Sequence, residues 1–132
     1  MKTWNINVVR VPLNEDCWLG INGLKPEVSG PAYQNALMGY VTRLLSHNLY
    51  VILELHWTAA GTAIANGQQP MPNDDHSIAL WISVASTFKN KPNIIFDLFN
   101  EPYPDRYSWS DAWRCYRDGG VCEGITYKVA GM

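Results

Sequence analysis

The sequence predicts an α/β fold in which about three βα units form a parallel sheet of the (β/α) barrel type. Two observations support this prediction. Three short apolar runs alternate with two segments of helical periodicity, which is the pattern of βαβ units. The loops that follow the runs are long, whereas the connections that precede them are short. This pattern predicts that the strands are parallel and that the crossovers between them are right-handed.

Three runs rich in β-branched and aromatic residues, each bounded by turn residues, predict buried strands. They cover residues 5–13, 49–57 and 93–100.

The first predicted helix follows a Ser-Gly-Pro start signal that ends at Pro31. Apolar residues then recur at intervals of three or four, which is typical of a helix with one buried face. They are Tyr33, Leu37, Val41, Leu44 and Leu45.

The second predicted helix opens at Asp74 and Asp75, whose carboxylates we expect to cap free N–H groups. It ends before Pro92, which follows two lysines and cannot continue a helix. Its predicted core face consists of Ile78, Trp81, Ala85 and Phe88.

The predicted loops after the strands cover residues 14–30, 58–73 and 102–110, and the predicted helix-to-strand connections cover only 46–48 and 89–92. In (β/α) barrels, the loops at the carboxyl ends of the strands carry the chemistry. We therefore expect function at this end of the sheet.

Polar residues occur at corresponding ends of the three predicted strands. Arg10, His56 and Glu101 are separated by 46 and 45 residues. Side chains alternate between the two faces of a strand, so Glu54 should share a face with His56, and Asp97 with Glu101. Buried charges need partners, and we expect Arg10, Glu54 and Asp97 to be coupled beneath the site in a structural role.

These residue types suit cleavage of a glycosidic bond. A carboxylic acid such as Glu101 can protonate the leaving oxygen if its surroundings favour the neutral form. Asn100 offers an amide to a sugar hydroxyl, and His56 and Trp57 offer a hydrogen-bonding edge and a stacking face. Arg10 could keep a carboxylate ionised.

A structural explanation remains open for each of these residues. Glu101, which precedes a proline, could be an ordinary turn residue. His56 could be a core histidine, and Arg10 could only neutralise Glu54. Their coincidence at three strand ends favours a site.

Composition narrows the partners. The chain of 132 residues has a formal net charge of −2 and no run of like charges, which gives no reason to expect nucleic acid or an anionic membrane. No apolar run approaches the roughly 20 residues of a membrane span, and the first residues lack the features of a signal peptide. Six Trp and seven Tyr offer surfaces for sugar rings.

Cysteine spacing predicts a disulfide between Cys115 and Cys122 if the protein matures in an oxidising compartment. Cys17 is then left over. The cysteines match no zinc pattern, and we expect no metal or other cofactor. A metal-dependent barrel enzyme that uses His56, Asp75 and His76 is a weaker alternative.

Segments 9–12, 53–57 and 97–102, with sequences VRVP, LELHW and DLFNEP, resemble the second, third and fourth strands of glycoside hydrolase family 5, the family of many cellulases. The resemblance covers nearly the whole chain and implies a partial (β/α)8 TIM barrel. It implies that Glu101 is the general acid/base and that Asn100 contacts the sugar. The second-strand Arg and third-strand His of the family fall on Arg10 and His56.

The resemblance also implies a secreted parent enzyme that hydrolyses β-linked polysaccharide with retention. Family members are complete barrels of about 250 residues or more, with the nucleophilic Glu on the seventh strand. We therefore expect residues 1–132 to be an internal piece of the catalytic domain, truncated at both ends, without the nucleophile and inactive alone. The alternative is a carbohydrate-binding module or an inactive barrel relative.

Overall fold

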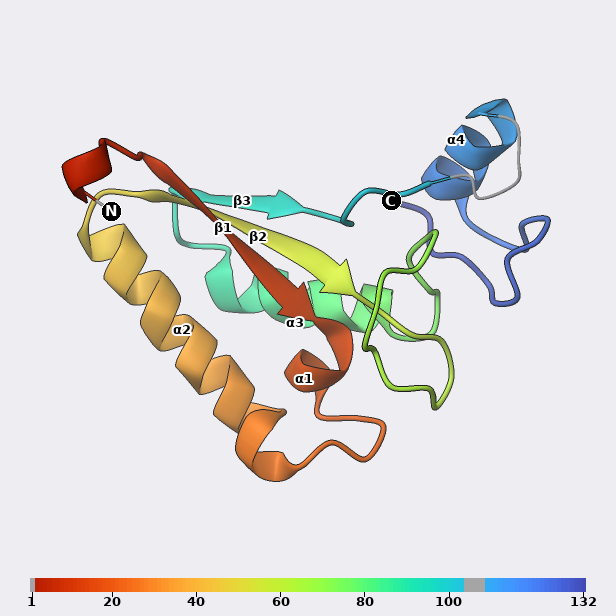
Figure 1. Cartoon of the computed structure of the whole chain (residues 1–132), viewed down its shortest axis with the longest axis horizontal. Coiled ribbons are helices and arrows are strands. Elements are labelled where there is room, and N and C mark those ends of the chain that lie inside the picture. The colour runs from red at the N-terminus through yellow and green to blue at the C-terminus, as the bar shows by residue number, and fades with distance from the viewer. Residues whose placement is uncertain (1, 104–108) are drawn as a thin grey trace.

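The computed structural model describes residues 2–103 and 109–132. Three strands alternate with helices along the chain (Figure 1). The elements are η1 (Lys2–Trp4), β1 (Val8–Asn14), α1 (Glu15–Leu19), η2 (Pro26–Val28), α2 (Pro31–Ser46), β2 (Tyr50–Trp57), α3 (Ser77–Phe88), β3 (Ile94–Asp97) and α4 (Trp109–Asp118).

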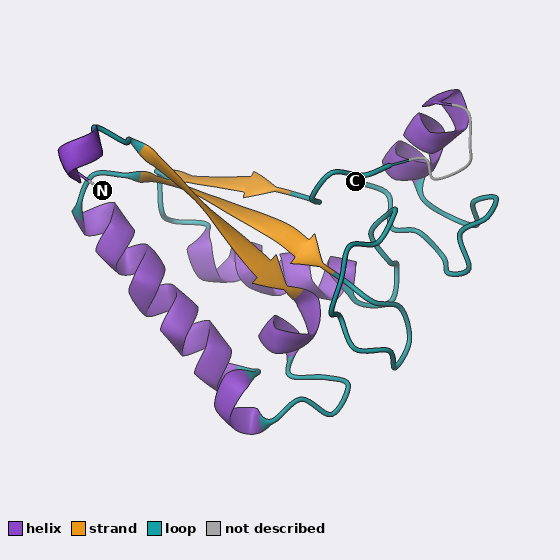
Figure 2. Ribbon diagram, in the orientation of Figure 1, coloured by secondary structure: helices purple, strands orange, loops and turns teal. Residues whose placement is uncertain are grey.

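The strands form one sheet in the order β1-β2-β3, and both pairs are parallel. Arg10 is in register with Ile52, and Glu54 with Asp97. Helices α1, α2 and α3 lie on one face of the sheet, and the three arrowheads point to the same end (Figures 1 and 2). The predicted parallel βα architecture, part of a TIM barrel, is therefore confirmed.

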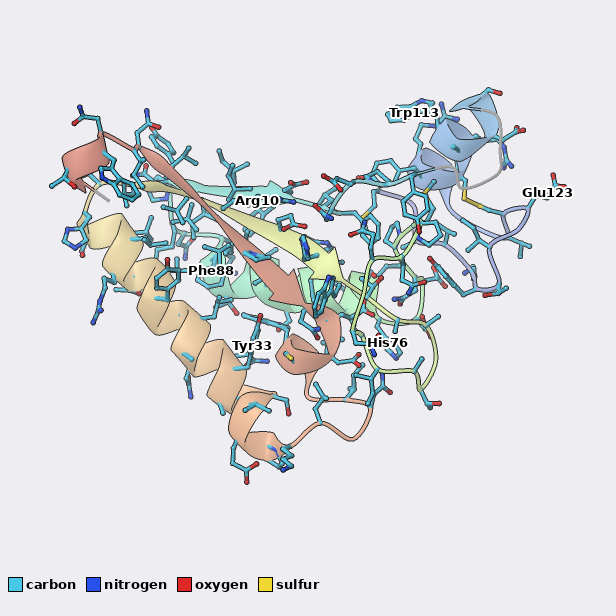
Figure 3. All side chains as sticks on the ribbon, viewed as in Figure 1. Arg10, Tyr33, His76, Phe88, Trp113 and Glu123 are labelled. Carbon is cyan, nitrogen blue, oxygen red and sulfur yellow. A yellow bond between two sulfur atoms is a disulfide. The ribbon has the colours of Figure 1, made fainter. Side chains whose placement is uncertain are left out.

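The main core lies between this face and the helices. Alternate residues of β1 and β2 are buried there, while the residues between them, such as Val8, Arg10 and Tyr50, lie on the other face and are exposed. In Figure 3, Tyr33 and Phe88 lie among the side chains between sheet and helices. Each fully buried aliphatic side chain contributes about 1.5–3 kcal/mol. The core includes Val11, Leu13, Val51, Leu53, Leu55, Leu37, Val41, Leu44, Leu80, Val84 and Phe88.

Helix α2 matches the first predicted helix, because Pro31 occupies its first turn and its buried residues follow the predicted spacing. Leu37, Val41 and Leu44 are buried. The strand predicted over residues 49–57 agrees with β2 to within one residue.

Two predicted strand boundaries are wrong. The first strand begins only at Val8, because Lys2–Trp4 is a 3-10 helix and Asn5 has φ 55°. The third ends at Asp97, three residues before the predicted end. Residues 99–101 form bends, so strand alternation does not place Glu101 on the same side as Asp97.

The start and the face of α3 also differ from prediction. The helix begins at Ser77 with His76 as its cap residue, and no side chain caps it, neither Asp74 nor Asp75. Asn73 Oδ1 accepts from the backbone N–H of His76 at 2.8 Å, directly before the helix. Ile78, on the predicted core face, is 45% exposed. The buried residues of α3 are Ser77, Leu80, Val84 and Phe88, and of the predicted face only Phe88 is buried.

A second apolar cluster lies beyond the carboxyl ends of the strands, where α4 and the C-terminal segment are found (Figure 1). It consists of Met71, Ala112, Cys115, Cys122, Ile125 and Val129. The predicted disulfide between Cys115 and Cys122 is confirmed, and Cys17 is a free thiol.

Long loops follow β1 and β2 as predicted, although the first contains α1 and η2. The third predicted loop, 102–110, includes residues 104–108, which lie outside the described residues. None of the described helices has the length and apolarity needed to cross a membrane.

Candidate active site

The sequence-predicted site residues come from β1, β2 and the turn after β3. Arg10 lies on β1, His56 and Trp57 end β2, and Asn100 and Glu101 follow β3. Asn100 stays attached to the sheet because its backbone N–H donates to Leu55 O at 2.9 Å.

Glu54 is the buried centre of a charged cluster. Its Oε1 atom lies 3.2 Å from Arg10 Nη2 and 3.1 Å from His56 Nδ1, and its exposed fraction is 0%. Opposite an ionised Glu54, which only accepts hydrogen bonds, Nδ1 of His56 would carry a proton and Nε2 would remain for a ligand. The expected coupling of Arg10 with Glu54 is confirmed.

Burial raises the pKa of Glu54, and the hydrogen bond and charge of His56 and the charge of Arg10 act against it. The charge of Asp97, its partner in register on β3, raises the pKa further. Asp97 is therefore coupled to Glu54 through its charge, in agreement with the predicted coupling of Arg10, Glu54 and Asp97.

Asn100 connects the charged cluster to the turn that carries Glu101. Arg10 Nη2 donates to Asn100 Oδ1. The side chain of Gln68, in the loop between β2 and α3, also bonds to Asn100. Asn100 itself is 3% exposed.

Glu101, the predicted proton donor, is exposed and lies in the left-handed region of the backbone with φ 44°. This conformation costs about 1–2 kcal/mol for a residue other than glycine, and such strain is concentrated at functional sites. Neighbouring hydrogen bonds must therefore hold the turn.

A pocket of about 200 Å³ lies beside His56 at the ends of β1 and β2. Trp57 is 41% exposed there and presents part of its ring to solvent. Its ring centroid lies 6.1 Å from that of His56. The lining residues are Pro12, Leu13, Asn14, Tyr33, His56 and Trp57.

Sequence reasoning missed two buried carboxylates. Glu15 and Asp16 were expected on a loop, but both are 0% exposed in α1. Glu15 accepts from Ser77 Oγ and from Asn73 Nδ2, both at 2.7 Å, and burial raises its pKa against these bonds. Asp16 accepts from Ala65 N at 2.8 Å. The available signal was their place directly after a strand and before an apolar Cys-Trp-Leu run.

The residues of the metal alternative do not form one group. His76 lies 3.8 Å from Asp75, whereas His56 contacts Glu54 instead. In residues 2–103 and 109–132, no group of three His, Cys, Asp or Glu side chains is arranged to hold a metal ion.

Solved structures of similar fold are glycoside hydrolases. The family 5 lichenase of Caldicellulosiruptor sp. F32 is 21% identical, with a TM-score of 0.59, over 89% of this chain and 34% of the lichenase. The catalytic domain of the major endoglucanase of Xanthomonas campestris pv. campestris is 20% identical, with a TM-score of 0.57, over 86% and 38%.

The endocellulase of Pyrococcus horikoshii is 20% identical, with a TM-score of 0.58, over 94% of this chain and 35% of the endocellulase. The chain thus spans about a third of the length of these enzymes. At this identity the likeness establishes the fold. No curated protein matches the sequence.

The sequence pattern itself is more specific than the structural likeness. Residues 1–121 match the family described as Cellulase (glycosyl hydrolase family 5). This match covers far more than half of the chain and includes every predicted site residue. The chain therefore belongs to the cellulase family, glycosyl hydrolase family 5.

Proposed function

We propose that the chain carries the acid/base half of a retaining glycoside hydrolase site that acts on a β-linked glucan, as cellulases do. The observation that supports this most is the single hydrogen-bonded cluster of Glu54, Arg10 and Asn100 next to Glu101. An ordinary turn residue would not require an Arg-Asn hydrogen bond anchored on a buried carboxylate beside it.

In this proposal Glu101 delivers its proton to the glycosidic oxygen as the C–O bond breaks, and its carboxylate then takes a proton from the attacking water. Retention also needs a nucleophilic carboxylate roughly 5 to 5.5 Å from the acid. We propose that this group belongs to a part of the enzyme outside residues 1–132.

The substrate-binding roles follow from the groups left available. Asn100 uses one of its two amide N–H groups for Gln68, which leaves one for a sugar hydroxyl. His56 offers Nε2, and Trp57 offers a ring face to a sugar. Arg10 would orient Asn100 and supply positive charge.

The neighbouring structures support a glucan as substrate. The Pyrococcus endocellulase was solved with cellotetraose, as was a mutant of the Caldicellulosiruptor lichenase.

The disulfide suits an oxidising compartment, and we propose an extracellular location for the parent enzyme.

The chain can be tested without its nucleophile, because a small anion can take the nucleophile's place. Azide would attack the anomeric carbon of phenyl β-cellobioside, the C–O bond would break, and the phenol oxygen would receive the proton of Glu101. The products are a glycosyl azide and phenol. We expect no turnover of carboxymethyl cellulose or aryl cellobiosides by the chain alone, and phenol release with azide.

Glu101→Gln should abolish this release, whereas a dinitrophenyl leaving group, which needs no proton, should still depart. Glu123→Gln, an exposed carboxylate on the C-terminal segment, is the matched control. Cellotetraose binding without azide-supported cleavage would favour the carbohydrate-binding alternative. The absence of both cellotetraose binding and azide-supported cleavage would refute the proposal. Turnover without azide would refute the proposal that the nucleophile lies outside residues 1–132.

A further inference from the structure

Gln68 makes a reciprocal pair of hydrogen bonds with Asn100. Its Nε2 donates to the backbone oxygen of Asn100 at 2.6 Å, and its Oε1 accepts from Asn100 Nδ2 at 2.6 Å. One side chain thus holds both the main chain and the side chain of the residue before Glu101.

The orientation of the Asn100 amide depends on this pair. Arg10 can only donate, so Oδ1 of Asn100 faces Arg10, and Nδ2 faces the acceptor of Gln68. Without Gln68 the Nδ2 side loses its acceptor, and Asn100 is then held by Arg10 and by the backbone bond to Leu55.

The bond to the backbone oxygen acts on Glu101 directly. This oxygen belongs to the peptide group that joins Asn100 to Glu101, and Glu101 has φ 44°. Since the left-handed conformation is unfavourable for glutamate, a strong bond at this peptide helps to select it.

The loop that carries Gln68 is itself fixed on both sides. Before it, Ala65 O accepts from Asn14 Nδ2 at 2.6 Å, and Ala65 N donates to the buried Asp16 at 2.8 Å. After it, Met71 O accepts from the hydroxyl of Tyr127 at 2.6 Å. Gln68 is therefore presented from an anchored segment.

We propose that Gln68 is a positioning residue, which sets the amide orientation of Asn100 and the backbone conformation that aims Glu101. The inference rests on the proposed function for the catalytic meaning of this turn. The hydrogen-bonding role itself can be tested without substrate.

The chain offers a matched control. Gln69 is the next residue, has the same partial exposure and makes no side-chain hydrogen bond in the part of the chain that the structure describes. Gln68→Met keeps the length of the side chain and removes both bonds, and Gln69→Met makes the same change beside it. Gln68→Glu keeps an acceptor for Nδ2 and removes the donor to the backbone oxygen.

In NMR spectra of the full chain, Gln68→Met should speed hydrogen exchange of the Asn100 side-chain amide by about tenfold and shift the Glu101 backbone signals. Gln69→Met should do neither. Gln68→Glu should shift the Glu101 backbone signals and leave the Asn100 side-chain amide protected from exchange. If Gln68→Met fails to fold, the result for Gln68→Glu tests the proposal. Unchanged Asn100 and Glu101 signals in both folded Gln68 variants would overturn the proposal.

A second measurement tests the consequence for catalysis. In azide-supported cleavage, Gln68→Met should slow the phenyl cellobioside about tenfold, since misplacing the acid costs acid catalysis. The dinitrophenyl cellobioside, which needs no proton, should be slowed much less, by the loss of the Asn100 contact to the sugar alone. Equal slowing of both would contradict positioning of Glu101. If the wild-type chain neither cleaves nor binds cellotetraose, the proposed function fails, whereas the exchange result still decides the role of Gln68.

Discussion

Arg10 on β1 donates a hydrogen bond to the side chain of Asn100, 90 residues further along the chain. The same nitrogen, Nη2, lies 3.2 Å from Oε1 of Glu54 on β2. One guanidinium therefore links β1, β2 and the turn after β3 and neutralises a buried carboxylate, although Arg10 lies near the start of β1 rather than at the strand end that the sequence predicted.

Replacing Arg10 by lysine should destabilise the chain. A lysine presents one ammonium rather than a planar fork, and Glu54, which is 0% exposed, would lose part of its compensation. Since Arg10 is 47% exposed, solvent screens the pair, and we expect a loss of about 1–2 kcal/mol. Urea unfolding measures this change. Arg43→Lys, on the exposed side of α2, should leave the free energy of unfolding unchanged. An equal loss of stability in Arg10→Lys and Arg43→Lys would contradict the role of Arg10.

Glu15 should give the fold a dependence on pH. Burial raises its pKa in the folded state above the ordinary value of 4.5. Its stabilising contribution is then complete below pH 4.5 and is lost as the pH rises through the folded-state pKa. Glu15→Gln should remove this loss, so that the unfolding free energy of the variant falls less between pH 4.5 and neutral pH than that of the wild type.

Urea unfolding at a series of pH values tests this expectation. Glu54, whose pKa is also raised, contributes a slope of the same sign that is present in both proteins. Glu27→Gln, at an exposed carboxylate, should give a curve parallel to the wild type. If the unfolding free energy of Glu15→Gln changes with pH in parallel with that of the wild type, the pKa of Glu15 is not raised.

Sequence periodicity was sufficient for the elements whose burial is decided locally. The spacing of Leu37, Val41 and Leu44 and the proline at position 31 predicted α2, and apolar runs predicted β1 and β2. Each of these elements is recognised by the apolar residues of its buried face, and α2 also by the proline at its start.

Features that depend on distant partners were not predicted. Glu15 is buried because Asn73 and Ser77, 58 and 62 residues away, donate to it, and no local pattern reveals such donors. Asn73 also accepts from the backbone N–H of His76, directly before α3, where the sequence predicted caps from Asp74 and Asp75. Gln68 contacts Asn100 across 32 residues of loop and helix, and its neighbour Gln69 looks the same in sequence.

The disulfide between Cys115 and Cys122 should stabilise the C-terminal segment. It closes a short loop, for which chain entropy gives about 2–3 kcal/mol, within the cluster that contains Met71 and Val129. The double variant Cys115→Ser with Cys122→Ser should unfold at lower urea and exchange its amides faster over residues 119–130. Cys17→Ser, at the free thiol, should leave both unchanged. Unaltered exchange in the double variant would contradict this role.

The open face of the sheet should make the chain associate with itself. Val8, Tyr50 and Ile95 lie on the face away from the helices and are 42%, 50% and 50% exposed. The sheet described here ends at β1 and β3, so each carries a strand edge that a second chain can pair with. Sedimentation velocity should therefore show an average mass that rises with protein concentration.

A charge on the open face distinguishes association through the sheet from non-specific association through any apolar surface. Ile95→Glu places a carboxylate on β3 among the exposed apolar residues of the sheet, and it should shift the distribution toward the monomer, because association would bury the charge. Ile82→Glu makes the same change on α3, at a residue that is 66% exposed and lies on the helical side. If both variants reduce association equally, the sheet face is not the contact, and if the wild type stays monomeric at all concentrations, its edges are protected in solution.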